Sequence, residues 1–332
     1  MPLNSHERML ACIKDDPALD RPPVALWRHF PVDDQRPETL AAATVDFQHH
    51  YHFDLVKVTP ASSFSIKDWG AEDVWEGHTE GTRRYTKRVI QKPVDWENLP
   101  VLDPLKAPHL SGQLGCLRVI RSALGPDVPL LQTVFSPLAQ AKNLAGADLL
   151  ITHIRLYPEA VLKGLQTIAE TTCRFVETAL ETGIDGIFFA IQHAQAGLLS
   201  LEEYMTFGLP FDLKTTQPAA GLWCNLLHLH GLDVYFDLVA RFSALFPIVN
   251  WHDRETRPSL GEAQKRFTGT VCGGVSQKTI VFGESARVHE EALDAIQQTG
   301  GRRFVLGTGC VAPVIAPHGN ILAVRQSVEE PA

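Results

Sequence analysis

Short apolar runs rich in β-type residues recur along this chain, and they limit its possible folds more than any other feature. Most of the runs are near-continuous rather than alternating, which is typical of parallel strands buried on both faces. Eight runs can be distinguished: Pro23–Phe30, Asp54–Pro60, Val128–Ser136, Gly183–Gln192, Trp223–Leu229, Pro247–His252, Val271–Val275 and Phe304–Cys310. We therefore predict a parallel sheet at the centre of the fold.

Several stretches between these runs have helical character. Gly146–Leu180 is long enough for two helices, and shorter amphipathic patterns occur at Glu202–Phe207, Leu232–Leu245, Ser259–Phe267 and Ala286–Thr299. Eight strands alternating with helices predict an α/β fold, the (β/α)8 TIM barrel. The alternative is an open doubly wound sheet, which would more often carry a glycine-rich phosphate loop after its first strand. The sequence contains no such loop.

The stretch from Ala61 to Pro126 is too long for a minimal strand–helix unit. Within it, Thr79–Tyr85 is typical of a polar hairpin turn between short strands, and Lys92–Pro108 is typical of a proline-marked loop. We interpret the stretch as an insertion after the second strand that covers one mouth of the barrel. Residues 1–332 contain no evident linker or repeat and are predicted to form a single domain.

The composition argues against several classes of protein. A formal net charge of −8 disfavours a nucleic-acid partner. No apolar stretch reaches the roughly 20 residues that span a bilayer, and the polar segment Met1–Arg8 lacks the apolar core of a signal peptide. Six scattered cysteines without a CxxC motif indicate free thiols in a reducing compartment. We therefore expect a cytoplasmic enzyme without membrane or nucleic-acid partners.

Two strand ends carry residues of the types that bind transition metals. His228 and His230 are separated by one residue within an apolar run, so a strand would point both imidazoles to the same face. Cys310 ends the last run, and barrel active sites lie at the carboxyl ends of the strands. The pattern predicts a three-ligand site for zinc or another divalent transition metal, with a position left for substrate. Taken singly, each residue can equally be structural, and Cys310 can be a small buried apolar side chain.

Other polar residues fall at the same predicted edge. Arg28 and His29 follow the first run; they either bind substrate or cap the barrel through surface ion pairs. Lys57 lies inside an apolar run, and burying an unpaired ammonium is costly, so we expect a nearby anionic substrate or carboxylate. Asp54 and Asp68 are candidate partners for that ammonium.

Three further residues at strand ends are candidates for catalysis. His193, His252 and Asp253 are predicted to transfer protons or to support the metal ligands. The segment around His252 and Asp253 can also be an ordinary loop.

Four segments in the same order resemble the uroporphyrinogen decarboxylase superfamily. They are Val128–Leu138; Gly183–Ile187 with Ala196–Tyr204 and Leu209-Pro210; Val271–Val275; and Gly307–Pro313 with Ala316-Pro317. The resemblance extends over most of the chain and implies a (β/α)8 barrel. The family divides into decarboxylases and methyltransferases, so the chain has to be placed by its site residues.

The decarboxylase branch fits poorly. Uroporphyrinogen decarboxylases carry an arginine-rich N-terminal segment that grips the substrate carboxylates, whereas only Arg28, with His29 beside it, stands in the corresponding region here. Their essential aspartate follows a Phe-Ser pair, but Phe64-Ser65 is followed by Ile66, and Asp68 is displaced. The resemblance therefore argues against a four-acid tetrapyrrole substrate.

The other branch resembles zinc-dependent methyltransferases that move a methyl group between a corrinoid and a thiol such as coenzyme M. Their ligands come from a His-x-Cys-Gly and a Gly-Cys segment, which His228 and Cys310 match. His230 replaces a cysteine. A site with two histidines and one cysteine is more Lewis-acidic than a two-thiolate site and holds an oxygen ligand more readily, and the replacement is also compatible with loss of the metal.

The expected function is a metal-dependent methyltransferase that activates a thiolate or similar acceptor. Arg28, His29, Lys57 and Asp68 would bind the small-molecule substrate. The sequence contains no corrinoid-binding domain, so a corrinoid donor would arrive free or on a separate protein. The alternatives are a decarboxylase or lyase of a small acid, and a non-catalytic partner in a methyl-transfer system. The oligomeric state is left open, a homodimer included.

Overall fold

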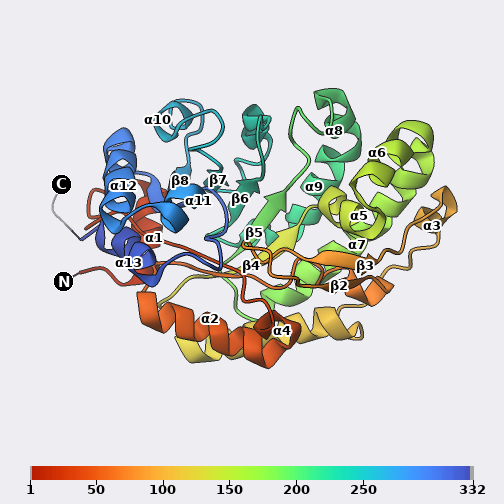
Figure 1. The fold of residues 1–332 in the computed structure, drawn as a ribbon, viewed down its shortest axis with the longest axis horizontal. Coiled ribbons are helices and arrows are strands. Elements are labelled where there is room, and N and C mark those ends of the chain that lie inside the picture. The colour runs from red at the N-terminus through yellow and green to blue at the C-terminus, as the bar shows by residue number, and fades with distance from the viewer. Residues whose placement is uncertain (1, 330–332) are drawn as a thin grey trace.

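Seven parallel strands form a curled sheet at the centre of the computed structural model, which describes residues 2–329 (Figure 1). The strands neighbour one another in the order β1 (Val56–Val58), β4 (Leu130–Phe135), β5 (Gly186–Ile191), β6 (Leu226–Leu229), β7 (Ile248–Trp251), β8 (Thr270–Val275) and β9 (Phe304–Thr308). Every residue of these strands is buried. The predicted parallel sheet with two buried faces is therefore confirmed for seven of the eight runs.

The first run, Pro23–Phe30, does not form a strand, and this part of the prediction is wrong. Val24 makes one isolated parallel bridge with Leu306. The N–H of Ala25 donates to the Leu306 carbonyl (2.9 Å), and the N–H of Asp54 donates to the Val24 carbonyl (2.8 Å). Proline has no N–H to donate, so Pro22 and Pro23 cannot extend a ladder here. Residues 23–25, which we call the Val24 segment, thus lie between β9 and the residues before β1.

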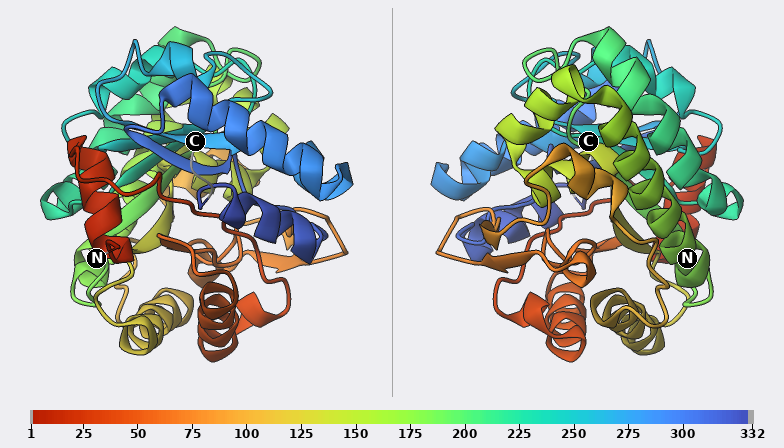
Figure 2. Two further views of the ribbon diagram at one scale, coloured as in Figure 1. Left: turned by 90° about the vertical axis from the view of Figure 1, so that its left-hand side faces the viewer. Right: turned by 90° about the vertical axis from the view of Figure 1, so that its right-hand side faces the viewer.

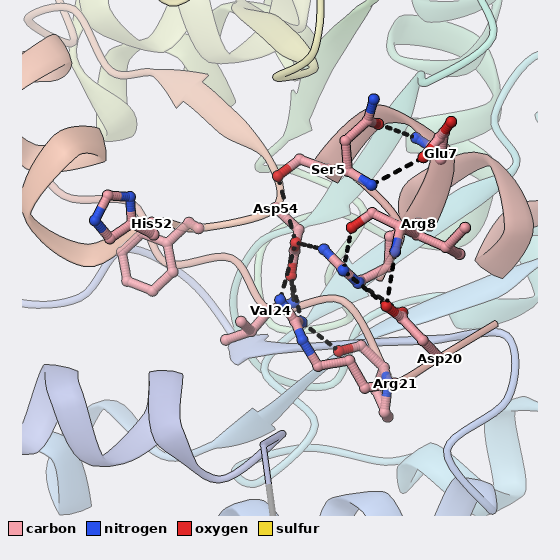
Figure 3. Close-up of polar contacts among 12 residues, drawn as sticks. Ser5, Glu7, Arg8, Asp20, Arg21, Val24, His52 and Asp54 are labelled. Atoms are coloured by element: carbon pink, nitrogen blue, oxygen red, sulfur yellow. Dashed lines mark hydrogen bonds and ion pairs between the residues drawn. The ribbon is translucent and has the colours of Figure 1, made fainter. Parts of the chain in front are cut away.

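A buried carboxylate fixes this segment in place (Figure 3). Asp54 is 1% exposed and accepts hydrogen bonds from Arg8 Nη1 (2.7 Å), Arg21 Nη1 (2.7 Å) and the N–H of Val24 (2.9 Å). Arg8 also pairs with Asp20 at 2.8 Å. Asp54 therefore joins the first helix and the Val24 segment to the start of β1, and it is not the predicted partner of Lys57.

Helices pack around the outside of the curled sheet, and α2 and α4 lie side by side along one edge (Figures 1 and 2). Their bounds are α1 (Ser5–Lys14), α2 (Pro37–Tyr51), α3 (Pro93–Glu97), α4 (Pro108–Leu124), α5 (Pro137–Ala145), α6 (Ala147–Leu156), α7 (Pro158–Leu180), α8 (Leu201–Phe207), α9 (Leu209–Thr216), α10 (Leu260–Ala263), α11 (Gln277–Phe282), α12 (Ser285–Thr299) and α13 (His318–Gln326). Short 3-10 helices lie at Asp33–Gln35, Lys67–Trp69, Gln217–Gly221 and Phe236–Arg241.

Most of the predicted helices are confirmed. Gly146–Leu180 holds α6 and α7, and local capping explains where others begin: Ser200 Oγ accepts the N–H of Glu203 at the start of α8, and the Glu203 carboxylate accepts the N–H of Ser200. Leu232–Leu245 is an exception, because it contains only the 3-10 helix Phe236–Arg241.

The predicted polar hairpin is present as a two-stranded antiparallel sheet, β2 (Glu72–Val74) with β3 (Arg84–Lys87). Its connecting turn is tied to the chain that follows β9, because the N–H of Val314 donates to the Thr79 carbonyl at 2.7 Å. The predicted proline-marked loop contains the short helix α3.

All six cysteines are free, as predicted, and all six are buried. Across residues 2–329, no helix combines the length and apolarity needed to cross a bilayer.

Candidate metal centre

The two histidines and the cysteine predicted as metal ligands come together at the carboxyl ends of β6 and β9. Cys310 Sγ lies 3.6 Å from His228 Nε2 and 3.6 Å from His230 Nδ1. His252, which follows β7, joins them with its Nε2 3.3 Å from His230 Nδ1. The four ligand atoms all lie within 4.8 Å of one another. We call these four residues the ligand cluster.

Parallel register explains why residues so far apart in sequence meet. β6, β7, β8 and β9 are consecutive neighbours, so their carboxyl ends share one edge. The side-chain period of two places His228 and His230 on the same face, as predicted. Gly309 allows the chain to turn closely over β7, because a Cβ there would lie only 2.8 Å from His252 Cα and from the Trp251 carbonyl oxygen.

Asn250 on β7 orients the first of these histidines. Its Nδ2 donates to the carbonyls of Cys272 (2.9 Å) and Thr308 (3.1 Å), so its Oδ1 is the acceptor facing His228 Nδ1 at 2.7 Å. His228 therefore carries its proton on Nδ1 and presents the Nε2 lone pair toward Cys310. Second hydrogen bonds of this kind commonly orient metal-binding histidines. Sequence reasoning missed Asn250; the available signal was one amide inside the apolar run Pro247–His252.

Burial keeps the ligand cluster uncharged. Burial, followed by the neighbouring His230 and His252, moves the pKa of His228 well below its ordinary value. Burial and His252 also lower the pKa of His230 to about 3, and burial raises the pKa of the Cys310 thiol to about 12. Neutral imidazoles offer lone pairs, and a bound cation would favour the thiolate. This set of nitrogen and sulfur donors suits zinc or a similar transition metal.

Lys57 lies beside the ligand cluster without a carboxylate partner. Its side chain is 7% exposed, its Nζ donates to Thr59 Oγ1 (3.3 Å), and it sits 4.5 Å from the centre of the Phe188 ring. That ring in turn stacks on His228 at 5.2 Å. Burial lowers the pKa of Lys57 to about 7, against the opposing influence of Cys310. Of the two alternatives raised from the sequence, a carboxylate partner is wrong within residues 2–329, and an anionic substrate remains.

His29 and Arg28 have different surroundings. His29 is 8% exposed, its Nδ1 has no hydrogen-bond partner, and burial, then the charges of Lys57 and Arg83, lowers its pKa to about 3. Arg28 instead packs over the Phe30 ring (5.6 Å), and its charge acts on Tyr51 of α2. Within residues 2–329, these interactions connect Arg28 to the helix layer and not to the ligand cluster.

Asp68 and Asp253 are each engaged by backbone groups. The Asp68 carboxylate accepts the N–H groups of His109 (3.1 Å) and Leu110 (3.0 Å) at the start of α4. Asp253 accepts the N–H of Gly274 (3.1 Å), and burial raises its pKa to about 7. Neither carboxylate contacts the ligand cluster among the described residues.

His193, the remaining candidate, follows β5 and is 3% exposed. Its Nδ1 has no hydrogen-bond partner. Burial, then the charge of Lys142 and the proximity of His230, lowers its pKa to about 3. His193 lies two residues after Ile191, whose carbonyl accepts the N–H of His230 (2.9 Å), and is therefore on the His230 side of the ligand cluster.

Solved structures of other proteins share this fold. A methyltransferase from Methanosarcina mazei superposes with a TM-score of 0.82 at 19% identity, covering 98% of each chain. A B12-independent methionine synthase from Shewanella sp. W3-18-1, in complex with selenomethionine, gives a TM-score of 0.53 at 14% identity, covering 88% of this chain and 86% of that one. A putative vitamin-B12 independent methionine synthase from Listeria monocytogenes gives 0.50 at 10% identity, covering 89% and 85%.

These similarities establish the fold alone, and a search of curated proteins gives no match. The family is established by sequence. The model of the uroporphyrinogen decarboxylase (URO-D) family matches residues 4–331, and the chain therefore belongs to that family.

Proposed function

We propose that this protein is a metal-dependent methyltransferase that activates a thiolate or a similar acceptor. The observation that carries the proposal is the ligand cluster, in which three imidazoles and one thiol converge within 4.8 Å at the carboxyl edge of the sheet. The likeness to the M. mazei methyltransferase supports the same reading. Zinc or another divalent transition metal would be held by His228, His230 and Cys310.

When bound, such a metal would supply Lewis acidity that lowers the pKa of an acceptor thiol. The protein's own residues would do the rest. Asn250 holds the His228 ring in the tautomer that leaves Nε2 free. His252 lies within reach of His230 and would serve either as a fourth ligand or as a proton carrier.

The other predicted site residues would have different roles according to where they lie around the ligand cluster. Lys57 and His29 would hold an anionic part of the substrate, and His193 would move protons on the His230 side. Asp253 would position the loop that carries His252. Arg28 and Asp68 remain substrate-binding candidates only if the elements that hold them move.

We also infer a barrel-like closure of the fold. The Val24 segment would stand in the place of an eighth strand, and the β2–β3 hairpin would be an insertion over the site. Glu80 in that hairpin is close enough to raise the pKa of His252 against the effect of burial, which supports this placement. The methyl donor would be a corrinoid on a separate protein.

One observation favours a second function, a carboxy-lyase of a small acid. Lys57 is a buried cation without a carboxylate partner among the described residues, next to His228, and it could bind a substrate carboxylate. In that case carbon dioxide would be released with no methyl acceptor present.

The test is the metal content of protein purified without a tag, together with methyl transfer from methylcobalamin to a thiol. His230→Ala removes a proposed ligand, and His49→Ala, an exposed histidine on α2, is the matched control. We expect about one equivalent of metal per chain and thiol-dependent demethylation in the wild type and in His49→Ala, and loss of both in His230→Ala. No metal in any of the three, even after reconstitution, would exclude this function.

A further inference from the structure

A second lysine approaches the ligand cluster from another side. Lys142 on α5 donates from its Nζ to Gln192 Oε1 at 2.8 Å, directly after β5. It has no carboxylate contact among residues 2–329. Burial, followed by the charge of Arg88, lowers its pKa. Lys142 is half-buried, and a bound anion would offset the desolvation of its ammonium.

The surroundings of Lys142 also contain an unused polar group. His193 is 3% exposed and its Nδ1 has no partner. Gln192, which Lys142 contacts, and His193 directly follow Ile191, whose carbonyl accepts the N–H of His230 at 2.9 Å. Lys142 and His193 therefore occupy the His230 side of the ligand cluster.

Lys57 occupies a different side. Its Nζ lies 4.5 Å from the centre of the Phe188 ring, which stacks on His228, the most buried member of the cluster. Within the described part of the chain, two cations without carboxylate partners thus border the ligand cluster, one over the Phe188–His228 stack and one beside His193. Phe188, which Lys57 contacts, and Gln192, which Lys142 contacts, are four residues apart along and just after β5, so the two ammonium groups stand at different levels of the sheet and mark separate binding positions.

We propose that Lys142, with His193, forms a second anion-binding position, and that the substrate is therefore a diacid whose two acidic groups bind on either side of the ligand cluster. Lys57 would bind one group and Lys142 the other. The inference rests on the proposed function only for the location of the reacting atom between them. The charge pairing itself needs no metal.

The test uses metal-free protein and measures binding of simple acids by isothermal titration calorimetry. The probes are the unbranched dicarboxylates from malonate to adipate, with butyrate as the monoacid. We expect one of the dicarboxylates to bind at least about tenfold more tightly than butyrate, since charge-assisted hydrogen bonds are the strong ones. Lys142→Met should remove this preference and leave butyrate affinity unchanged, whereas Lys57→Met should weaken both.

Lys106→Met is the matched control, because that lysine is on the surface with a side chain 85% exposed. Lys142→Met should also melt no lower than the wild type, because it removes an uncompensated charge. A diacid preference that survives Lys142→Met, the absence of any preference, or a clear drop in melting temperature in Lys142→Met would overturn the proposal. A diacid preference in protein that takes up no metal would instead overturn only the metal-dependent function.

Discussion

Replacing Asn250 with alanine should weaken metal binding and stability together. The substitution removes the acceptor for His228 Nδ1 and both donors to the carbonyls of Cys272 and Thr308, all of them buried. Each buried polar group left unpaired costs about 1–3 kcal/mol, so we expect metal-free protein to lose about 3 kcal/mol or more. The His228 ring would also be free to turn or change tautomer, which at such supporting positions lowers metal affinity about 10–100-fold.

The matched control is Asn225→Ala. Asn225 is an equally buried amide just before β6; it accepts the N–H of Ile187 (2.9 Å) and donates to the carbonyls of Ala219 (2.9 Å) and Leu245 (3.0 Å). It should cost comparable stability without changing metal affinity. Urea unfolding of metal-free protein gives the stabilities, and competition with a chromophoric chelator gives the affinities. If Asn250→Ala binds metal as tightly as Asn225→Ala, then the orientation of His228 by Asn250 is irrelevant to the site.

Three further predictions concern the rest of the molecule. Asp54→Ala removes the carboxylate shared by buried Arg8, which keeps Asp20, and half-buried Arg21, so urea unfolding should show a loss of about 3 kcal/mol; a loss below about 1 kcal/mol would contradict the role assigned to Asp54. Burial raises the pKa of Asp212 from 3.8 to about 7, and the hydrogen bond from Tyr204 opposes this rise. Folding therefore favours the neutral carboxyl group, and the resulting stabilisation of the folded state is lost as the pH rises from about 4 to about 7. Asp212→Asn should remove about 2.5 kcal/mol of the decline in stability between pH 5 and pH 7.5, and an unchanged pH profile would refute this. Chelation should lower the melting temperature of metal-loaded protein, because metal at 100 times its Kd stabilises by about 2.7 kcal/mol, and His230→Ala should show no such change.

The convergence of His228, His230 and Cys310 was predictable because their geometry follows from two general rules. Strand alternation puts His228 and His230 on one face, and parallel strands bring Cys310 to the same edge. His252 was singled out for proton transfer and not as part of the cluster, because its distance from His230 depends on the loop that follows β7. Lys57 was identified by its unusual place in an apolar run.

Other features had no local signal. Pro23–Phe30 has a strand-like composition, but Pro22 and Pro23 have no N–H group to donate to the backbone hydrogen bonds between neighbouring strands. Arg28 and His29 are adjacent, and neighbouring side chains of an extended segment point in opposite directions. The sequence does not show which of the two faces the interior. Asp68 resembled a displaced catalytic acid, but its carboxylate accepts the first N–H groups of α4. The sequence does not indicate this role, because it depends on where α4 packs in the fold.

The Val24 segment has a consequence for how this sheet behaves toward other chains. It exchanges backbone hydrogen bonds with Leu306 of β9 and accepts the N–H of Asp54 before β1, so neither end of the sheet lacks a hydrogen-bonded neighbour there. Unpaired strand edges are templates for pairing with another molecule. A version of the protein that lacks residues 1–25 would expose the edges of β1 and β9 together, and it would be prone to self-association through intermolecular β-pairing even where the rest of the fold survives.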